Sequence, residues 1–120
     1  MKKPGTEGDC YDSNGRHFMD HAQENWKLIH GVVINQIDNL PMGHCWIEVT
    51  DTVELPNGVR FENTMIIDKS NDRNIEMPLP LYYMAGKINS SVSSVYDANE
   101  YRKNILETGD WGPWKELCNR

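Results

Sequence analysis

The segment from residue 43 to residue 68 constrains the fold more than any other part of the chain. Successive side chains of a strand point to opposite faces of a sheet. One face would carry His44, Trp46 and Glu48, and the other would carry Cys45, Ile47 and Val49. Asn57-Gly58 accepts the positive φ of a tight turn, so residues 59–68 are expected to return antiparallel and to end at Asp68. The pattern predicts a long β-hairpin with one face in the core and the other forming a site.

Helical patterns lie on both sides of this hairpin. Asp9 is a typical helix N-cap and is followed by a stripe with helical spacing, made of Tyr11, Gly15, Phe18 and Ala22. Near the C-terminus, Asp97 and Glu100 form a capping box and Gly109 ends the helix. The stripe of this second helix is expected to be Ala98, Tyr101, Ile105 and Leu106. We predict an α+β fold in which the N-terminal helix packs on an antiparallel sheet, together with a C-terminal helix.

Three shorter strands complete the predicted sheet. They are expected at residues 28–34, 81–88 and 91–96, which are apolar or β-branched in part. Pro78 and Pro80 exclude a regular helix or a central strand before residue 81. The polar stretch from Lys69 to Asn74 is therefore expected to be a loop that leads into these prolines.

The two ends of the chain are predicted to differ. Residues 1–8 are polar and contain Pro and Gly, which indicates a flexible tail, whereas residues 9–120 form a single domain. Trp111 and Trp114 are expected to fold back onto this domain, because two exposed Trp side chains would favour association.

Composition narrows the classes of function. The net charge of −6 argues against nucleic-acid binding, which needs clustered Lys and Arg. No run approaches the roughly 20 apolar residues of a membrane span, and no apolar export signal follows Met1, so a cytoplasmic protein is expected. The three cysteines lack CxxC spacing, which favours free thiols over a disulfide framework or a Cys-rich zinc module. No cofactor is indicated.

Three side chains on separate elements could form a catalytic triad. Cys10 would lie in the first turn of the first helix, where free N–H groups and the helix dipole favour a thiolate. His44 would be the base, and Asp68 would hold the imidazole ring. The alternative is structural, with a small buried Cys, a hydrogen-bonded core His and an Asp that forms a turn.

These motifs resemble the core of transglutaminase-like and papain-like cysteine enzymes, in which Cys, His and Asp or Asn follow in this order. The chain also resembles a small family of phage and bacterial proteins with short motifs that match His30-Gly31, residues 43–48, Tyr82-Tyr83 and Gly112-Pro113-Trp114. The resemblance implies Cys10 as nucleophile, His44 as base and Asp68 as the residue that orients it. In the related pattern Ala stands at the position of Cys45.

Oxyanion and substrate contacts are expected next to the triad. The nine residues before Cys10 contain no Gln of the kind that papain-like enzymes use in the oxyanion hole. Backbone N–H groups at the helix start would serve instead, together with Asn14. Trp46 should lie beside His44 and could form the wall of a substrate cleft, although most Trp and Tyr side chains of the chain are expected in the core.

A second cluster offers a different chemistry. His17 and His21 are four residues apart on one helix face, which suits a metal site if a third ligand such as His44 or Cys45 completes it. A zinc protease helix has Glu directly after its first His, and Phe18 stands there instead. A pair of this kind more often lies on a solvated face, so no metal is assigned.

Two functions from different classes remain. The first is a cysteine-dependent acyl-transfer enzyme that hydrolyses an amide or isopeptide, deamidates Gln or transfers an acyl group on a protein or peptide substrate. The second is a phage accessory protein that binds and inhibits a host protein in the host cytoplasm and keeps the enzyme-like fold only for its shape.

Overall fold

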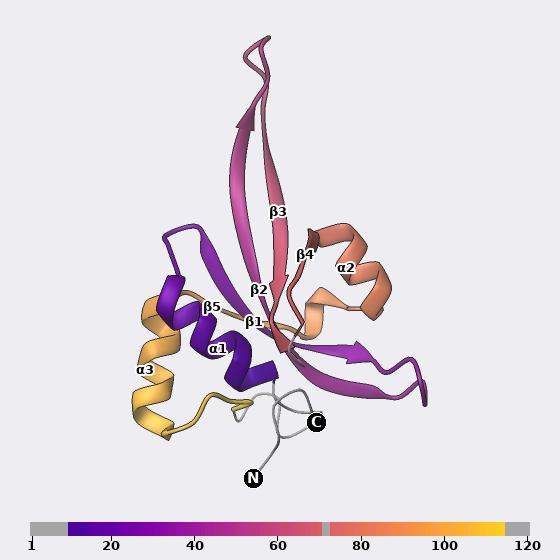
Figure 1. Cartoon of the computed structure of the whole chain (residues 1–120), viewed down its shortest axis with the longest axis vertical. Helices are drawn as coiled ribbons and strands as arrows, with labels where there is room; N and C mark the ends of the chain where they lie inside the picture. The colour runs from indigo at the N-terminus through magenta and orange to yellow at the C-terminus, as the bar shows by residue number, and fades with distance from the viewer. Residues whose placement is uncertain (1–9, 71–72, 115–120) are drawn as a thin grey trace.

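A computed structural model of the chain describes residues 10–70 and 73–114. Its elements follow in the order α1 (Cys10–His21), β1 (Trp26–Ile34), β2 (Pro41–Glu54), β3 (Arg60–Asp68), β4 (Ile75–Pro78), α2 (Leu79–Gly86), η2 (Ser90–Val92), β5 (Ser94–Tyr96) and α3 (Ala98–Thr108). The predicted tail at residues 1–8, the predicted N-cap Asp9 and the third cysteine, Cys118, lie outside the described residues. The expected α+β class is confirmed, with α1 and α3 on one side of an antiparallel sheet and α2 on the other (Figure 1).

The sheet has five antiparallel strands in the order β4-β3-β2-β1-β5. Strand β2 is its longest member and pairs with different neighbours along its length. Its first part, Pro41–Val49, pairs with β1, and its last part, Ile47–Glu54, pairs with β3. The predicted hairpin turn is confirmed, with Gly58 at φ 87°. Two hairpins therefore share β2 and point in different directions, and the β2–β3 hairpin stands out from the body (Figure 1).

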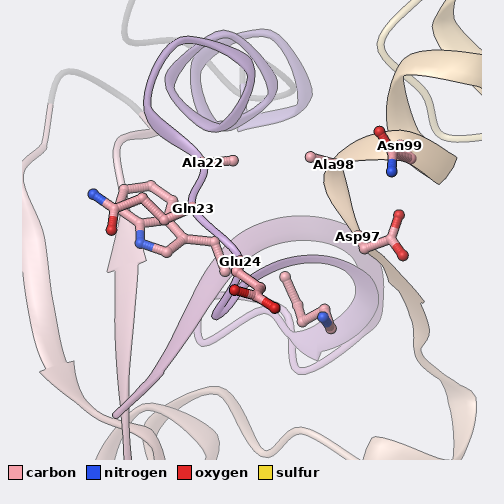
Figure 2. Close-up of a pocket in the computed structure, with 8 residues that line it drawn as sticks. Ala22, Gln23, Glu24, Asp97, Ala98 and Asn99 are labelled. Carbon is pink, nitrogen blue, oxygen red and sulfur yellow. The ribbon is translucent and has the colours of Figure 1, made fainter.

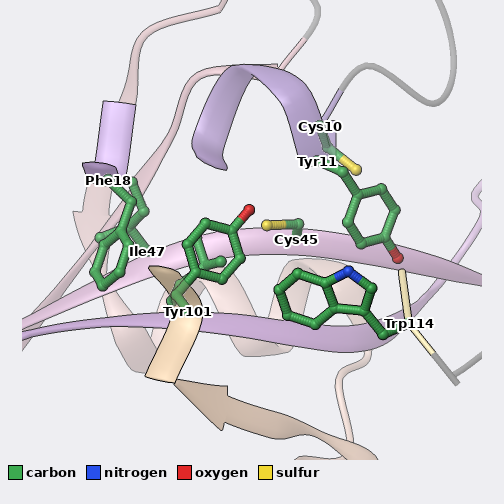
Figure 3. Packing of buried hydrophobic residues seen from close by; sticks show 8 residues of the cluster. Cys10, Tyr11, Phe18, Cys45, Ile47, Tyr101 and Trp114 are labelled. Carbon is green, nitrogen blue, oxygen red and sulfur yellow. The ribbon is translucent and has the colours of Figure 1, made fainter. Parts of the chain in front are cut away.

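The predicted alternation along β2 is confirmed, but both faces of the sheet are buried. On one face, Cys45 and Ile47 pack in a core with α1 and α3, whose members include Phe18 and Tyr101 (Figure 3). On the other face, Trp46 packs with Ile29, Ile66 and Tyr82 in a second core. The face that was predicted to form a site therefore also contains a packed core, because α2 covers Trp46.

Helix α2 replaces one of the predicted strands. Residues 81–88 were expected to extend the sheet, but residues 79–86 form a helix with Pro80 in its first turn. Proline is tolerated there, because the first N–H groups of a helix have no partner within the helix. The segment just before it forms the edge strand β4, which ends at Pro78. An edge strand tolerates proline because a backbone N–H on its outer side has no partner in the sheet.

The C-terminal region folds back onto the domain and contacts α1. The capping box of Asp97 and Glu100 and the Gly109 terminus are confirmed. Leu106 departs from the predicted stripe, since it is 78% exposed. The predicted strand at residues 91–96 is shortened to Ser94–Tyr96, after a turn of 3-10 helix. Trp114 is buried in the first core, so the predicted return of this segment is confirmed.

Gly15 is needed where α1 meets this region. A Cβ atom at Gly15 would collide with the hydroxyl of Tyr101 and would lie 2.7 Å from the Trp111 ring. Gly15 therefore marks a close approach between α1 and the C-terminal region. None of the helices in residues 10–70 and 73–114 is long and apolar enough to cross a membrane.

Candidate active site

Strand register brings the imidazole and the carboxylate together. Ile47 pairs with Ile67, so the next residue of β3, Asp68, lies on the same face as Trp46 and His44. Strand β3 ends at Asp68, whereas β2 continues beyond this level to Pro41. His44 therefore lies just past the end of its neighbouring strand, at a gap in that side of the sheet.

The three residues predicted as a triad meet at this gap. His44 Nε2 lies 3.0 Å from Asp68 Oδ2. The side chain of Cys10, the first residue of α1, lies close enough to the His44 ring to raise the pKa of that ring. Since Nε2 is engaged by Asp68, Nδ1 is the ring nitrogen left for the thiol. The order is sulfur, imidazole, carboxylate, as nucleophilic catalysis by cysteine requires.

The Asp68 carboxylate accepts four hydrogen bonds. Oδ2 accepts from His44 and, at 2.7 Å, from the Tyr82 hydroxyl, while Oδ1 accepts from Asn14 Nδ2 and from the backbone N–H of Ser70, both at 3.0 Å. Burial alone would raise the pKa of Asp68, but the hydrogen bonds from His44, Asn14 and Tyr82 and the charge of His44 hold it well below its usual range. Asp68 is therefore an anion although it is 3% exposed.

The imidazole is held in its protonated form. Burial acts to lower the pKa of His44, and the hydrogen bonds to Asp68 and Cys10 outweigh it and raise the pKa from 6.5 to about 10. At neutral pH the ring is thus an imidazolium between a carboxylate and a sulfur. Cys10 lies beside this imidazolium and at the N-terminus of α1.

Asn14 connects α1 to the ends of both strands. Its Nδ2 donates to the carbonyl oxygen of Cys45 at 2.8 Å as well as to Asp68, and its Oδ1 accepts from the backbone N–H of Lys69 at 2.8 Å. The side chain is fully buried, and both of its N–H donors are engaged. The sequence pointed to Asn14 as an oxyanion donor, but in this structure it has no donor to spare. Its contacts position Asp68 and fix α1 against β2.

Trp46 supports the histidine from within the second core. Its ring centroid lies 6.0 Å from that of His44, and the side chain is completely buried. The indole Nε1 donates to Glu48 Oε2 at 3.1 Å, and the Tyr83 hydroxyl donates to the same oxygen. Trp46 does not reach solvent and so does not line an open cleft here, and Glu48 is half-buried rather than solvated.

The two described thiols lie in different environments. Cys10 and Cys45 are both free and buried. Burial raises the pKa of Cys45 well above its usual value, and the charges of Cys10 and Asp68 add to this effect. Cys45 is therefore a neutral thiol that packs in the core. Cys10 is 4% exposed and the side chain of His44 is 15% exposed, so the triad reaches the surface mainly through His44.

Other candidate sites lie away from the triad. A cavity of about 370 Å³ is formed by the α1–β1 turn and the start of α3, and Ala22, Trp26, Lys27 and Asp97 are among its lining residues (Figure 2). The rings of His17 and His21 lie 4.5 Å apart. No third His, Cys, Asp or Glu joins them, since the described part of the chain contains no such group of three.

Sequence reasoning missed Tyr82 as a member of the site. Tyr82-Tyr83 was noted only as a motif, and it was placed on a strand rather than on α2. A helix puts consecutive side chains about 100° apart, so both hydroxyls can reach acids on the covered face, Tyr82 at Asp68 and Tyr83 at Glu48. The available signal was two adjacent Tyr residues in an apolar segment, matched by two acids on the same face of neighbouring strands.

Comparisons with protein-family models, with curated proteins and with solved structures gave no match to this chain.

Proposed function

We propose that this protein is a cysteine-dependent acyl-transfer enzyme of the transglutaminase-like or papain-like type. The observation that supports this most directly is that Cys10 and Asp68 both interact with the His44 ring, and that Asp68 does so at 3.0 Å. The ionised carboxylate fixes the ring orientation, and the protonated ring lies next to the sulfur. A purely structural triplet would not need the nucleophile at a helix start as well.

The reaction would follow from the charges of the site. The Cys10 thiolate attacks the carbonyl carbon of an amide or ester, and the negative charge moves to the carbonyl oxygen. Backbone N–H groups at the start of α1 are the donors in position to stabilise that oxygen, since Asn14 is engaged elsewhere. His44 then gives its proton to the leaving amine or alcohol, which leaves a thioester on Cys10.

The second half regenerates the enzyme. Neutral His44 takes a proton from water, the resulting hydroxide attacks the thioester, and the carboxylic acid and the Cys10 sulfur are released. If an amine replaces water as the acceptor, the product is a new amide. Hydrolysis, deamidation and transfer thus differ only in the carbonyl compound and the acceptor. We propose a protein or peptide as the substrate and the cytoplasm as the location.

One observation favours the second candidate, a binding protein without catalytic activity. Cys10 is 4% exposed, and a nucleophile must be reached by its substrate. In such a protein the buried network of Asp68 would act only to hold α1, β3 and α2 together. The two proposals therefore differ in whether an acyl group can reach the sulfur.

The test is acylation of Cys10 in a Cys118→Ser background, which leaves the two described thiols. The protein is treated with p-nitrophenyl acetate near pH 7, and peptides that carry each cysteine are analysed by mass spectrometry. We expect an acetyl group on Cys10 and none on Cys45. His44→Ala should slow acylation about a hundredfold, the usual size of a general acid–base contribution. His21→Ala, a substitution of an exposed histidine, is the matched control.

Alkylation by iodoacetamide gives an independent measurement that does not depend on the ester. Faster labelling of Cys10 than of Cys45, reduced by His44→Ala, supports the enzyme. Equal and slow labelling of both thiols, or acylation that is unchanged in His44→Ala, would refute the catalytic proposal and favour the binding protein. Circular dichroism of each variant shows that the fold is kept.

A further inference from the structure

The outer half of the β2–β3 hairpin forms an arm, and no residue of this arm belongs to either of the two described cores. We define the arm as residues 50–64. Strand β1 pairs with β2 only as far as Val49, and β4 pairs with β3 only from Met65 onward. The arm is thus a two-stranded ribbon whose outer edges carry no other strand within the described residues, and it stands clear of the body (Figure 1). At about 3.3 Å per residue, each strand of the arm extends about 17 Å.

One face of the arm is apolar at its tip. Val53 pairs with Phe61, and the N–H of Leu55 donates to the carbonyl oxygen of Val59, so these four side chains share a face. Leu55 is 40% exposed, Phe61 47% and Val59 51%. The face continues that of Cys45 and Ile47, which α1 covers nearer the body. An isolated two-stranded ribbon is marginally stable in water. Apolar side chains that gather uncovered at the tip of such a ribbon indicate a binding surface.

The opposite face of the arm is polar. It carries the hydroxyl pair of Thr50 and Thr64, with Thr52 and Glu62 further out and Glu54 and Arg60 next to the turn. Arg60 Nε donates to Glu54 Oε1 at 3.1 Å. The arm holds three carboxylates and one guanidinium, so its net charge is −2. Once the pair of Glu54 and Arg60 is counted, this charge remains on Glu62 and on Asp51. Asp51 lies on the face of Val53 and accepts a hydrogen bond from Asn25 Nδ2.

We propose that the apolar face of the arm docks onto another protein whose contact surface is an apolar strip bordered by Lys or Arg. The charge of the arm is the reason for this choice of partner. A second copy of this chain would bring two acidic arms together within a chain of net charge −6, and anionic lipids or nucleic acids would be repelled in the same way. The proposal does not depend on the triad, so Cys10→Ala should bind the partner equally well.

The test uses two synthetic peptides with the same apolar positions, one alternating Val and Lys and the other alternating Val and Glu. Each is titrated into the full, isotope-labelled chain, and amide shifts are followed by NMR at low and high salt. We expect the Lys peptide to shift the amides of residues 51–63 and to bind less tightly as salt rises. Phe61→Ser should weaken binding about tenfold, and Thr52→Ala, on the polar face, should leave it unchanged.

Each contrary result overturns a separate part of the proposal. Equal binding of the Lys and Glu peptides would remove the charge argument, and equal binding by Phe61→Ser would remove the apolar face. A failure of the Lys peptide to shift the arm would also refute the proposal. Concentration-dependent dimers in sedimentation velocity that disappear in Phe61→Ser would assign the face to a second copy. Thermal unfolding of both variants shows whether they remain folded.

Discussion

Removal of the Tyr82 hydroxyl tests how the triad carboxylate is kept ionised. The hydroxyl donates to Asp68 Oδ2 at 2.7 Å, the same oxygen that accepts from His44. Tyr82→Phe keeps the ring, which packs 5.6 Å from that of Trp46, and leaves only the space of one oxygen atom. The change therefore removes a donor from a buried anion with little loss of packing.

The expected effect follows from the charge of the acceptor. A hydrogen bond to a charged group contributes about 1.5 to 3 kcal/mol, so we expect Tyr82→Phe to lower the free energy of unfolding by about 2 kcal/mol near pH 7. At about 1.4 kcal/mol per pKa unit, the folded pKa of Asp68 should rise by roughly 1 to 2 units from its depressed value. A depressed carboxyl pKa stabilises the fold above the unfolded pKa, and this stabilisation is lost as pH falls through the folded pKa. The difference between the two proteins should therefore be constant from pH 7 down to about pH 4 and should shrink below that.

Urea unfolding at several pH values measures this difference. Tyr83→Phe is the matched control, because it removes the same atom from the next residue, whose acceptor Glu48 is only half-buried. We expect a smaller effect there, since a carboxylate that reaches solvent can recover a hydrogen bond from water. If Tyr82→Phe costs under about 0.5 kcal/mol, or no more than Tyr83→Phe, Asp68 does not depend on the donor from α2 and the account of the site is wrong.

Three further predictions follow from the same contacts. The pKa of His44 is raised from 6.5 to about 10, so the contribution of its protonated form to stability is complete below pH 6.5 and is lost as pH rises to about 10. Urea unfolding should show that the free energy of unfolding falls by at most about 5 kcal/mol over this range. This pH-dependent fall should be absent in His44→Gln. Asn14→Ala deprives the Cys45 carbonyl and the Lys69 N–H of their partner, and should cost roughly 3 to 5 kcal/mol by urea unfolding; a cost under about 1 kcal/mol would contradict this. Gly15→Ala introduces a Cβ 2.7 Å from Trp111, and the strain of about 1 to 3 kcal/mol should outweigh the gain in helix propensity of about 1 kcal/mol; a raised thermal midpoint would show that the ring moves freely.

The parts of the fold that local signals determine were predictable from the sequence. The Asn57-Gly58 turn and the capping box at Asp97 each depend on a few neighbouring residues. Helix α2 was not predictable in this way, because Pro80 excludes a helix interior but is tolerated in a first turn. Without α2, the sequence did not reveal that the second face of the sheet carries a core of its own.

The candidate site was predictable in its members but not in its contacts. Cys10 at a helix start, His44 on a strand and Asp68 at a strand end are positions that the sequence pattern supplies. Their hydrogen bonds depend on strand register, which fixes how far β2 continues past Asp68. Asn14 was placed near the site, but its partners are backbone groups of Cys45 and Lys69, whose directions no side-chain pattern reveals.

The residue at which β3 ends determines both the strand pairing in this part of the sheet and the position of α1 at the site. If β3 ran on beside β2, its backbone would supply the donor for the Cys45 carbonyl, and the start of α1 would have no place at His44. Because β3 ends at Asp68, Asn14 supplies that donor instead and at the same time binds the carboxylate. The hydrogen bond from Asn14 to the Cys45 carbonyl thus also brings Cys10, four residues earlier on the same helix, to the imidazole. Any change that extends β3 should displace the thiol as well as Asn14, so stability and thiol reactivity should fall together.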